Sequence, residues 1–209
     1  MRSNGGLTFT ERARREQFIE AALAIIAADG YPQASVAKIA EHVGVAKSVV
    51  LYHFKTKNDI IVAAVAAVLG RAGTLIGPAV VAESTARGKL AAYIRANARF
   101  IADSRIAAVA MLEITTSFRS DTGLRFDQAV AEAVGSAAPT GELELLDPSG
   151  FITAGIESGE FRSISAVFAK NALRAALDGA VWEIARDSEY DVIGYGEELV
   201  AMFDRALRS

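Results

Sequence analysis

The feature of this sequence that most restricts its fold is a series of short apolar repeats at helical spacing, each closed by a glycine or a proline. Near the N-terminus these repeats occupy about residues 8–29, 36–43 and 47–53. Gly30 closes the first repeat and Gly44 the second. Only three residues separate the last two repeats, which is the spacing of a helix-turn-helix unit. We therefore predict three short helices, the third of which would enter the major groove of DNA.

Alanine extends the helical prediction to the whole chain. The sequence holds 41 alanines and only 4 prolines in 209 residues, and alanine has the highest intrinsic helix propensity. No segment alternates between apolar and polar residues long enough to predict a strand, so we expect an all-α protein. Further helices are expected over about residues 56–76, 84–104, 106–118, up to 134, 151–158, 165–186 and 191–207, with a breaker-rich segment, GSAAPTG, at 135–141.

Composition excludes several kinds of chemistry. The chain has no cysteine and two histidines, His42 and His53, so disulfides, thiolate metal sites and cysteine nucleophiles are absent. The net charge is −3, with +2 on residues 1–60 and −5 on the remainder. The longest uncharged apolar stretch, Ile60 to Gly70, is about half of a membrane span, and the first residues lack the apolar core of a secretion signal. We therefore expect a cytoplasmic protein with no membrane partner and no cofactor.

Residues 34–61 carry the most specific pattern. They read ASVAKIAEHVGVAKSVVLYHFKTKNDII and closely resemble the DNA-binding signature of the TetR family of bacterial transcriptional regulators. The resemblance covers about residues 12–62, and a weaker one lies in GIESGEFR at 155–162 with AALDGA at 175–180. The motifs that match the family are Gly44-Val45, Tyr52-His53-Phe54 and Lys55-Thr56-Lys57-Asn58-Asp59.

The resemblance implies a domain organisation and a function. It implies a three-helix helix-turn-helix DNA-binding domain over residues 1–58 and a larger helical effector-binding and dimerisation domain over residues 59–209. It further implies a transcriptional repressor that a small-molecule effector releases from its operator. Such a protein would act as a homodimer on a palindromic duplex, because one short recognition helix reads too few bases alone.

The expected DNA contacts follow from side-chain chemistry. Lys47 can donate to a guanine or a phosphate, and Val49 can pack against a thymine methyl group. Lys57 stands at a predicted helix start, where free N–H groups favour an anion. The alternatives are that His53 packs in the three-helix core and that the lysines form an ordinary solvated face. We predict DNA contacts from Ser35, Ala46, Lys47, Ser48, Val49, Tyr52, His53 and Lys57.

The chain also departs from the family pattern. Each departure removes a polar group near the DNA, so an atypical operator or affinity is expected while the fold is unaffected. The departures are Leu51 in place of a second tyrosine, Ala46 in place of a serine, Ser48-Val49 in place of Gly-Thr, and Ala37 in place of an arginine.

The family resemblance places the dimer interface on the last two long helices. The apolar stripes there suit a four-helix contact between two copies, although they could instead close the core of one chain. The predicted interface residues are Ala169, Leu173, Ala176, Leu177, Val181, Val200 and Phe203.

An effector pocket is predicted around the apolar segment 106–118. Glu113 lies in the middle of this segment, and a buried carboxylate needs a partner or a cavity. For each candidate residue, ordinary packing is the alternative. The predicted pocket residues are Tyr93, Asn97, Phe100, Met111, Glu113, Phe118, Asn171, Asp178 and Trp182.

Two other classes of function compete with this prediction. An enzyme built on a helical bundle is disfavoured because the chain has no histidine after His53 and no Glu-x-x-His spacing. A helical adaptor that binds protein would share the fold but not the affinity for duplex DNA. The sequence therefore predicts a regulator that is not an enzyme.

Overall fold

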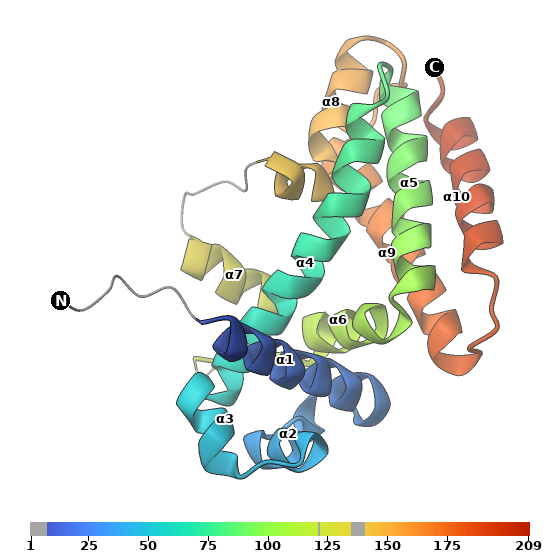
Figure 1. Ribbon diagram of the computed structural model, residues 1–209. Coiled ribbons are helices and arrows are strands. Elements are labelled where there is room, and N and C mark those ends of the chain that lie inside the picture. The colour runs from blue at the N-terminus through green and yellow to red at the C-terminus, as the bar shows by residue number, and fades with distance from the viewer. Residues whose placement is uncertain (1–7, 121, 135–140) are drawn as a thin grey trace.

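The computed structural model describes residues 8–120, 122–134 and 141–209, and in these ranges the chain is helical with a single isolated bridge between Phe161 and Arg208. The all-α prediction is confirmed, while the predicted breaker segment falls almost entirely outside the described residues. The elements, shown in Figure 1, are α1 (Phe9–Asp29), η1 (Tyr31–Gln33), α2 (Val36–Val43), α3 (Lys47–His53), α4 (Lys57–Val81), α5 (Ala86–Asp103), α6 (Arg105–Ser117), α7 (Phe126–Val134), η2 (Gly141–Leu146), α8 (Ser149–Glu157), α9 (Ala166–Arg186) and α10 (Val192–Leu207).

Side-chain caps fix where several helices begin. Thr8 and Glu11 form a reciprocal capping box at the start of α1, and Thr56 and Asp59 form another at the start of α4. The Ser35 hydroxyl accepts a hydrogen bond from the Lys38 amide at the start of α2. Each cap satisfies an amide that the helix itself leaves without a partner. The local sequence therefore sets these boundaries.

The predicted end of α4 is wrong. The helix continues through Gly77 and Pro78 to Val81, although proline lacks the amide that would continue the hydrogen-bond ladder. Ile76 and Val80 are each 1% exposed, so burial of the last turns offsets the lost hydrogen bond. Among the described residues α4 is also the one helix long and apolar enough to span a membrane, but half of its most apolar stretch is buried within the fold.

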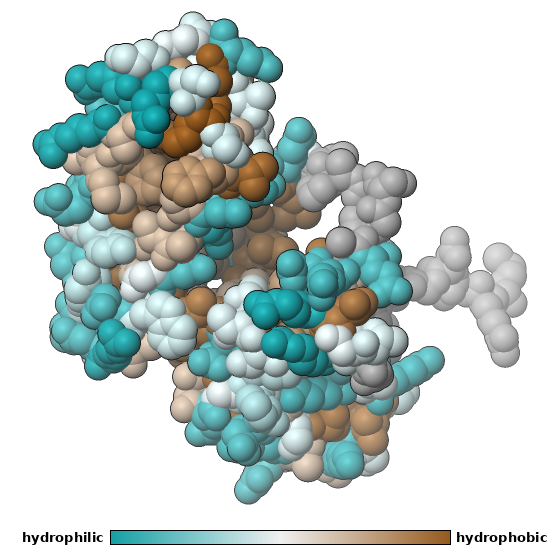
Figure 2. All heavy atoms as spheres, turned by 180° about the vertical axis from the view of Figure 1, so that it is seen from behind, coloured by the Kyte–Doolittle hydropathy of each residue, from teal (hydrophilic) through white to brown (hydrophobic). Residues whose placement is uncertain are grey.

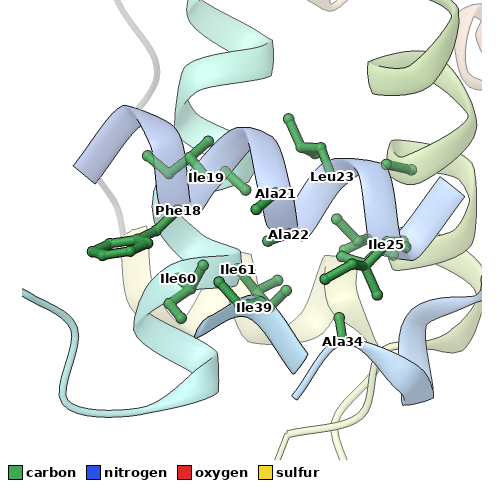
Figure 3. Close-up of a cluster of buried hydrophobic side chains, with 14 of the residues drawn as sticks. Phe18, Ile19, Ala21, Ala22, Leu23, Ile25, Ala34, Ile39, Ile60 and Ile61 are labelled. Atoms are coloured by element: carbon green, nitrogen blue, oxygen red, sulfur yellow. The ribbon is translucent and has the colours of Figure 1, made fainter. Parts of the chain in front are cut away.

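The first core cluster lies where α1, α2, α3 and α4 meet. Figure 3 shows Phe18 of α1 on the same side of that helix as Ile39 of α2 and Ile60 and Ile61 of α4, while Leu23 points from the opposite side of α1. All five side chains are fully or almost fully buried. Residues of α6 join the same cluster, so the core continues across the predicted boundary at residue 58. The N-terminal helices are therefore packed onto the larger domain.

The second part of the fold is a helical bundle of α4, α5, α8, α9 and α10 (Figure 1). Helix α10 lies along α5 of its own chain. The guanidinium of Arg95 donates two hydrogen bonds to the Glu197 carboxylate, at 2.7 and 2.8 Å. Arg87 pairs with Asp204 at 2.6 Å. These exposed ion pairs fix the register of the two helices more than they stabilise the fold.

Candidate DNA-binding surface and effector pocket

The first candidate surface is the outer face of α3. Gly44, with φ at +73°, adopts the left-handed conformation that turns the chain from α2 towards α3. Val50 is fully buried and anchors the short helix. Ala46, Lys47, Ser48 and Val49 are all exposed. The residues predicted to meet base edges therefore face solvent together.

Helix α1 holds the far end of α3. The Arg15 guanidinium donates a hydrogen bond to the backbone carbonyl of His53, and it lies 3.8 Å from the centre of the Phe54 ring. The Phe18 ring lies 5.6 Å from the His53 ring. Sequence reasoning missed Arg15, although its place one turn before Phe18 on α1 would put both side chains on one helix face. Arg15 and Phe18 therefore position the recognition helix.

His53 and Tyr52 have different environments. His53 is half-buried between Phe18 and Tyr52, whose ring centre is 5.1 Å from that of His53. Tyr52 is 76% exposed. The packed alternative for His53 therefore matches the structure, whereas the Tyr52 hydroxyl is open to a phosphate oxygen.

Lys57 makes contacts that the sequence did not suggest. Its ammonium group donates a hydrogen bond to the Tyr31 carbonyl at 2.8 Å and lies 4.2 Å from the centre of the Tyr31 ring. Partial burial lowers the pKa of Lys57. The Tyr31 ring lies 6.0 Å from that of Phe118, directly after α6. A phosphate contact by Lys57 would therefore compete with a bond inside the protein.

A cavity of about 180 Å³ lies in the larger domain, between α4, α5, α6, η2 and α9. Four predicted pocket residues line it: Asn97, Phe100, Met111 and Asp178. The rest of the wall is mostly apolar and comes from Val68, Leu69, Ala72, Ile76, Ile101, Ala108, Leu112, Thr115, Leu146, Leu177 and Val181, with Arg174 as the one cationic side chain.

Arg174 joins the polar residues of this wall. Its Nη1 lies 3.3 Å from the Tyr93 hydroxyl and 3.5 Å from the Asn97 side-chain oxygen. The Tyr93 hydroxyl donates to the Leu146 carbonyl at 2.9 Å. Burial opposes the charge on Arg174, but attraction to Tyr93 and Asp178 outweighs it and raises the pKa of the guanidinium. Sequence reasoning missed Arg174, although it stands one turn before Asp178 on the same helix.

Two predicted pocket residues of the α6 region lie at the domain junction instead. Glu113 is on the side of α6 that faces the end of α1, where its Oε2 would lie 3.9 Å from a Cβ built at Gly30. Phe118 is buried between Tyr31 and Phe126. The cavity takes the opposite face of α6, because residues 108, 111, 112 and 115 share one side of a helix with 3.6 residues per turn. Neither residue therefore lines this cavity.

Three other predicted pocket residues do not line the cavity. Asn171 is exposed, and Trp182 is 45% exposed on the outer side of α9. Tyr93 is fully buried behind the wall and reaches the polar residues only through its hydroxyl. The seven-residue and four-residue spacings that grouped Asn171, Asp178 and Trp182 describe one broad helix face, and only Asp178 lies at its inner edge.

Most of the predicted dimer residues are also misplaced. Ala169, Leu173, Leu177, Val181 and Phe203 are each at most 7% exposed within the single chain. They belong to the core clusters of the same chain, the first four from α9 and Phe203 from α10. Ala176 and Val200 pack against the same core but stay half-buried, so their place in a dimer interface remains a prediction. The stripes therefore close the core of one chain, as the alternative interpretation held.

Comparison with known proteins agrees with the DNA-binding interpretation. Residues 18–64 match the family of bacterial regulatory proteins named tetR, and this match contains α2, α3 and the start of α4. The chain is 29% identical over 196 residues to the Fatty acid metabolism regulator protein of Bacillus subtilis, covering 92% of this chain and 94% of that protein. The similarity therefore extends beyond the helix-turn-helix unit.

Solved structures share the whole arrangement of helices. The transcriptional regulator FadR from Bacillus subtilis, in complex with stearoyl-CoA, superposes with a TM-score of 0.71 at 27% identity and covers 90% of this chain and 96% of its own. The fatty acid degradation regulator FadR from Bacillus halodurans gives 0.72 at 22% identity, covering 92% and 99%. The chain is therefore a transcriptional regulator that carries the DNA-binding domain of the tetR family.

Proposed function

We propose that this protein is a homodimeric repressor that leaves a palindromic operator when a long-chain acyl effector enters the cavity between α4, α5, α6, η2 and α9. The observation that carries the proposal is the cavity wall, which is mostly apolar and has its charged side chains, Arg174 and Asp178, together on α9. Such a wall suits an apolar chain with one polar end. The stearoyl-CoA complex of the Bacillus subtilis regulator supports an acyl chain as the apolar part.

The DNA-binding part of the proposal uses the N-terminal domain, residues 1–58. Ala46, Lys47, Ser48 and Val49 read base edges, while Tyr52 and the start of α4 contact phosphates. Two copies related by a twofold axis would place their α3 helices about 34–36 Å apart, in successive major grooves. The protein would act in the cytoplasm by binding rather than by catalysis.

The dimer surface in this proposal is the outer face of α9. Phe168 is 63% exposed, and Ala175 and Trp182 follow at intervals of seven residues on the same side of the helix. Met202 of α10 is also exposed. Figure 2 views the molecule from behind, and apolar surface is visible there over the upper half. Large aromatic side chains exposed together are typical of an interface between proteins.

In this proposal DNA is released because the cavity must expand to admit the effector. At about 180 Å³ it is smaller than the ~300–1,000 Å³ usual for ligand pockets, so an acyl chain must push the surrounding helices apart. Helix α6 belongs to the wall and leads into Phe118, which packs on Tyr31. An effector that favours the expanded state would therefore shift the N-terminal helices away from their DNA-bound positions.

The proposal is tested by titrating protein bound to a duplex selected from a random library. Palmitoyl-CoA should release the labelled duplex, and coenzyme A without an acyl chain should not. Release by neither compound would contradict the acyl effector. For the dimer, Phe168→Glu should give monomers in sedimentation at micromolar concentration, whereas Phe9→Glu, an exposed residue of α1, should leave the dimer intact.

A further inference from the structure

The polar residues of the cavity wall indicate which chemical group the polar end of the effector has. Arg174 and Asp178 stand one turn apart on α9, and both line the cavity. Arg174 is exposed and Asp178 is half-buried, so the pair lies at the rim and the apolar wall continues inwards. A ligand with an apolar chain would therefore present its polar end to this pair.

Arg174 has hydrogen-bond donors to spare. Its two contacts within the described part of the chain both involve Nη1, and both are long. A guanidinium carries five N–H groups in a planar fork, so Nε and Nη2 can donate to a ligand oxygen. One of the two N–H groups of the Asn97 side chain is already used, because its amide nitrogen donates to the Tyr93 carbonyl at 2.8 Å.

Asp178 is a carboxylate without a bonded partner. Among the described residues it makes no hydrogen bond and no ion pair within 4 Å, and only the longer-range field of Arg174 acts on it. Burial raises the pKa of Asp178, and Arg174 partly offsets this effect. The rim thus holds one cation and one anion before any ligand enters.

We infer that the Arg174–Asp178 pair selects a neutral acyl carbonyl, such as that of a thioester, over the carboxylate of a free fatty acid. This inference rests on the proposed acyl effector. A neutral carbonyl oxygen accepts a hydrogen bond from Arg174 and loses little hydration. A carboxylate would also bond to Arg174, but it would bring a second anion next to Asp178 and would pay a larger desolvation cost.

The test compares two ligands with the same chain and different polar ends, decanamide and decanoate, by titration calorimetry. The wild-type protein should prefer decanamide. Asp178→Asn should tighten decanoate binding by about tenfold and change decanamide binding much less, because only the like-charge repulsion is removed. Arg174→Gln should weaken decanamide binding by about tenfold, and Arg174→Lys should restore it only in part, because lysine lacks the planar fork.

Matched controls are available on the same helix. Glu183 and Arg186 pair with each other at 3.4 Å, away from the cavity, so Glu183→Gln and Arg186→Gln should change neither affinity. Thermal unfolding and circular dichroism of each variant establish that it is folded. An unchanged ratio of decanoate to decanamide affinity in folded Asp178→Asn would overturn the inference.

The outcomes also separate this inference from the proposed function. If decanoyl-CoA releases DNA from the wild type but Arg174→Gln binds decanamide as the wild type does, the acyl effector stands and the role of the pair is wrong. If the wild type binds none of these ten-carbon ligands and palmitoyl-CoA does not release DNA from it either, the acyl effector itself is wrong.

Discussion

The recognition helix and the effector cavity present their side chains in opposite ways. Helix α3 exposes four consecutive residues, 46–49, and is held from behind by α1. The cavity gathers residues from five elements, and its lining extends from Val68 of α4 to Val181 of α9. On α3 each side chain is expected to act on its own DNA contact, whereas in the cavity each side chain changes a volume that the others share. The two regions should therefore respond differently to substitution.

The largest expected effect comes from the support behind α3. Phe54 is 2% exposed and lies under the Arg15 guanidinium, so Phe54→Ala should lower the free energy of unfolding by about 3–5 kcal/mol. Urea denaturation measures the change. Tyr52→Ala, at an exposed neighbouring position, should change stability by less than about 0.5 kcal/mol. Equal losses in both variants would show that α3 is not held from behind as described.

A smaller effect is expected on the exposed face of α3. Lys47→Ala should cost about 1–3 kcal/mol of DNA-binding free energy and should change the preferred sequence, because the lysine is assigned to a base edge. Sequence selection from a random duplex library measures both. Lys55→Ala, at an exposed position just beyond the helix, should leave the preferred sequence unaltered. If the Lys47 variant prefers the same DNA sequence as the wild type, Lys47 contacts a phosphate rather than a base edge.

In the cavity, added volume should weaken the response to the effector. Ala108 is 6% exposed and lines the wall, so Ala108→Leu should fill space that an acyl chain needs. Overpacking of about 1–3 kcal/mol corresponds to roughly a tenfold higher effector concentration for half-release of DNA. Ala66→Leu, on the exposed side of α4, is the matched control. A wild-type effector response in the Ala108 variant would place the acyl chain elsewhere.

The smallest expected effect concerns the residue between the two regions. If Lys57 leaves the Tyr31 carbonyl and meets a phosphate, Lys57→Ala should weaken binding to all duplexes about equally and lower the salt slope by about one unit. Affinity measured over a series of salt concentrations gives the slope. Lys170→Ala, whose lysine pairs with Asp147 in the larger domain, should leave the slope unchanged. If the Lys57 variant has the same salt slope as the wild type, Lys57 keeps its hydrogen bond to the Tyr31 carbonyl in the complex and does not contact a phosphate.

The sequence by itself determined the helices and the DNA-binding unit. Caps such as Thr56 with Asp59 and the turn at Gly44 act within a few residues of one another, so local patterns are enough to predict them. The α3 surface could be predicted for the same reason, because its residues are consecutive. The end of α4 could not, because the burial of Ile76 and Val80 by distant elements outweighs the local signal of Pro78.

The tertiary structure decided which face of each long helix meets which neighbour. A repeat of apolar residues on α9 looks the same whether its partner is a second chain or the rest of its own chain, and here Leu173 and Leu177 are buried by their own chain. The same ambiguity misplaced Glu113, whose helix has two buried sides. Arg174 and Asn97 come together across 77 residues of sequence, and such a contact depends on the packing of whole helices rather than on any local pattern.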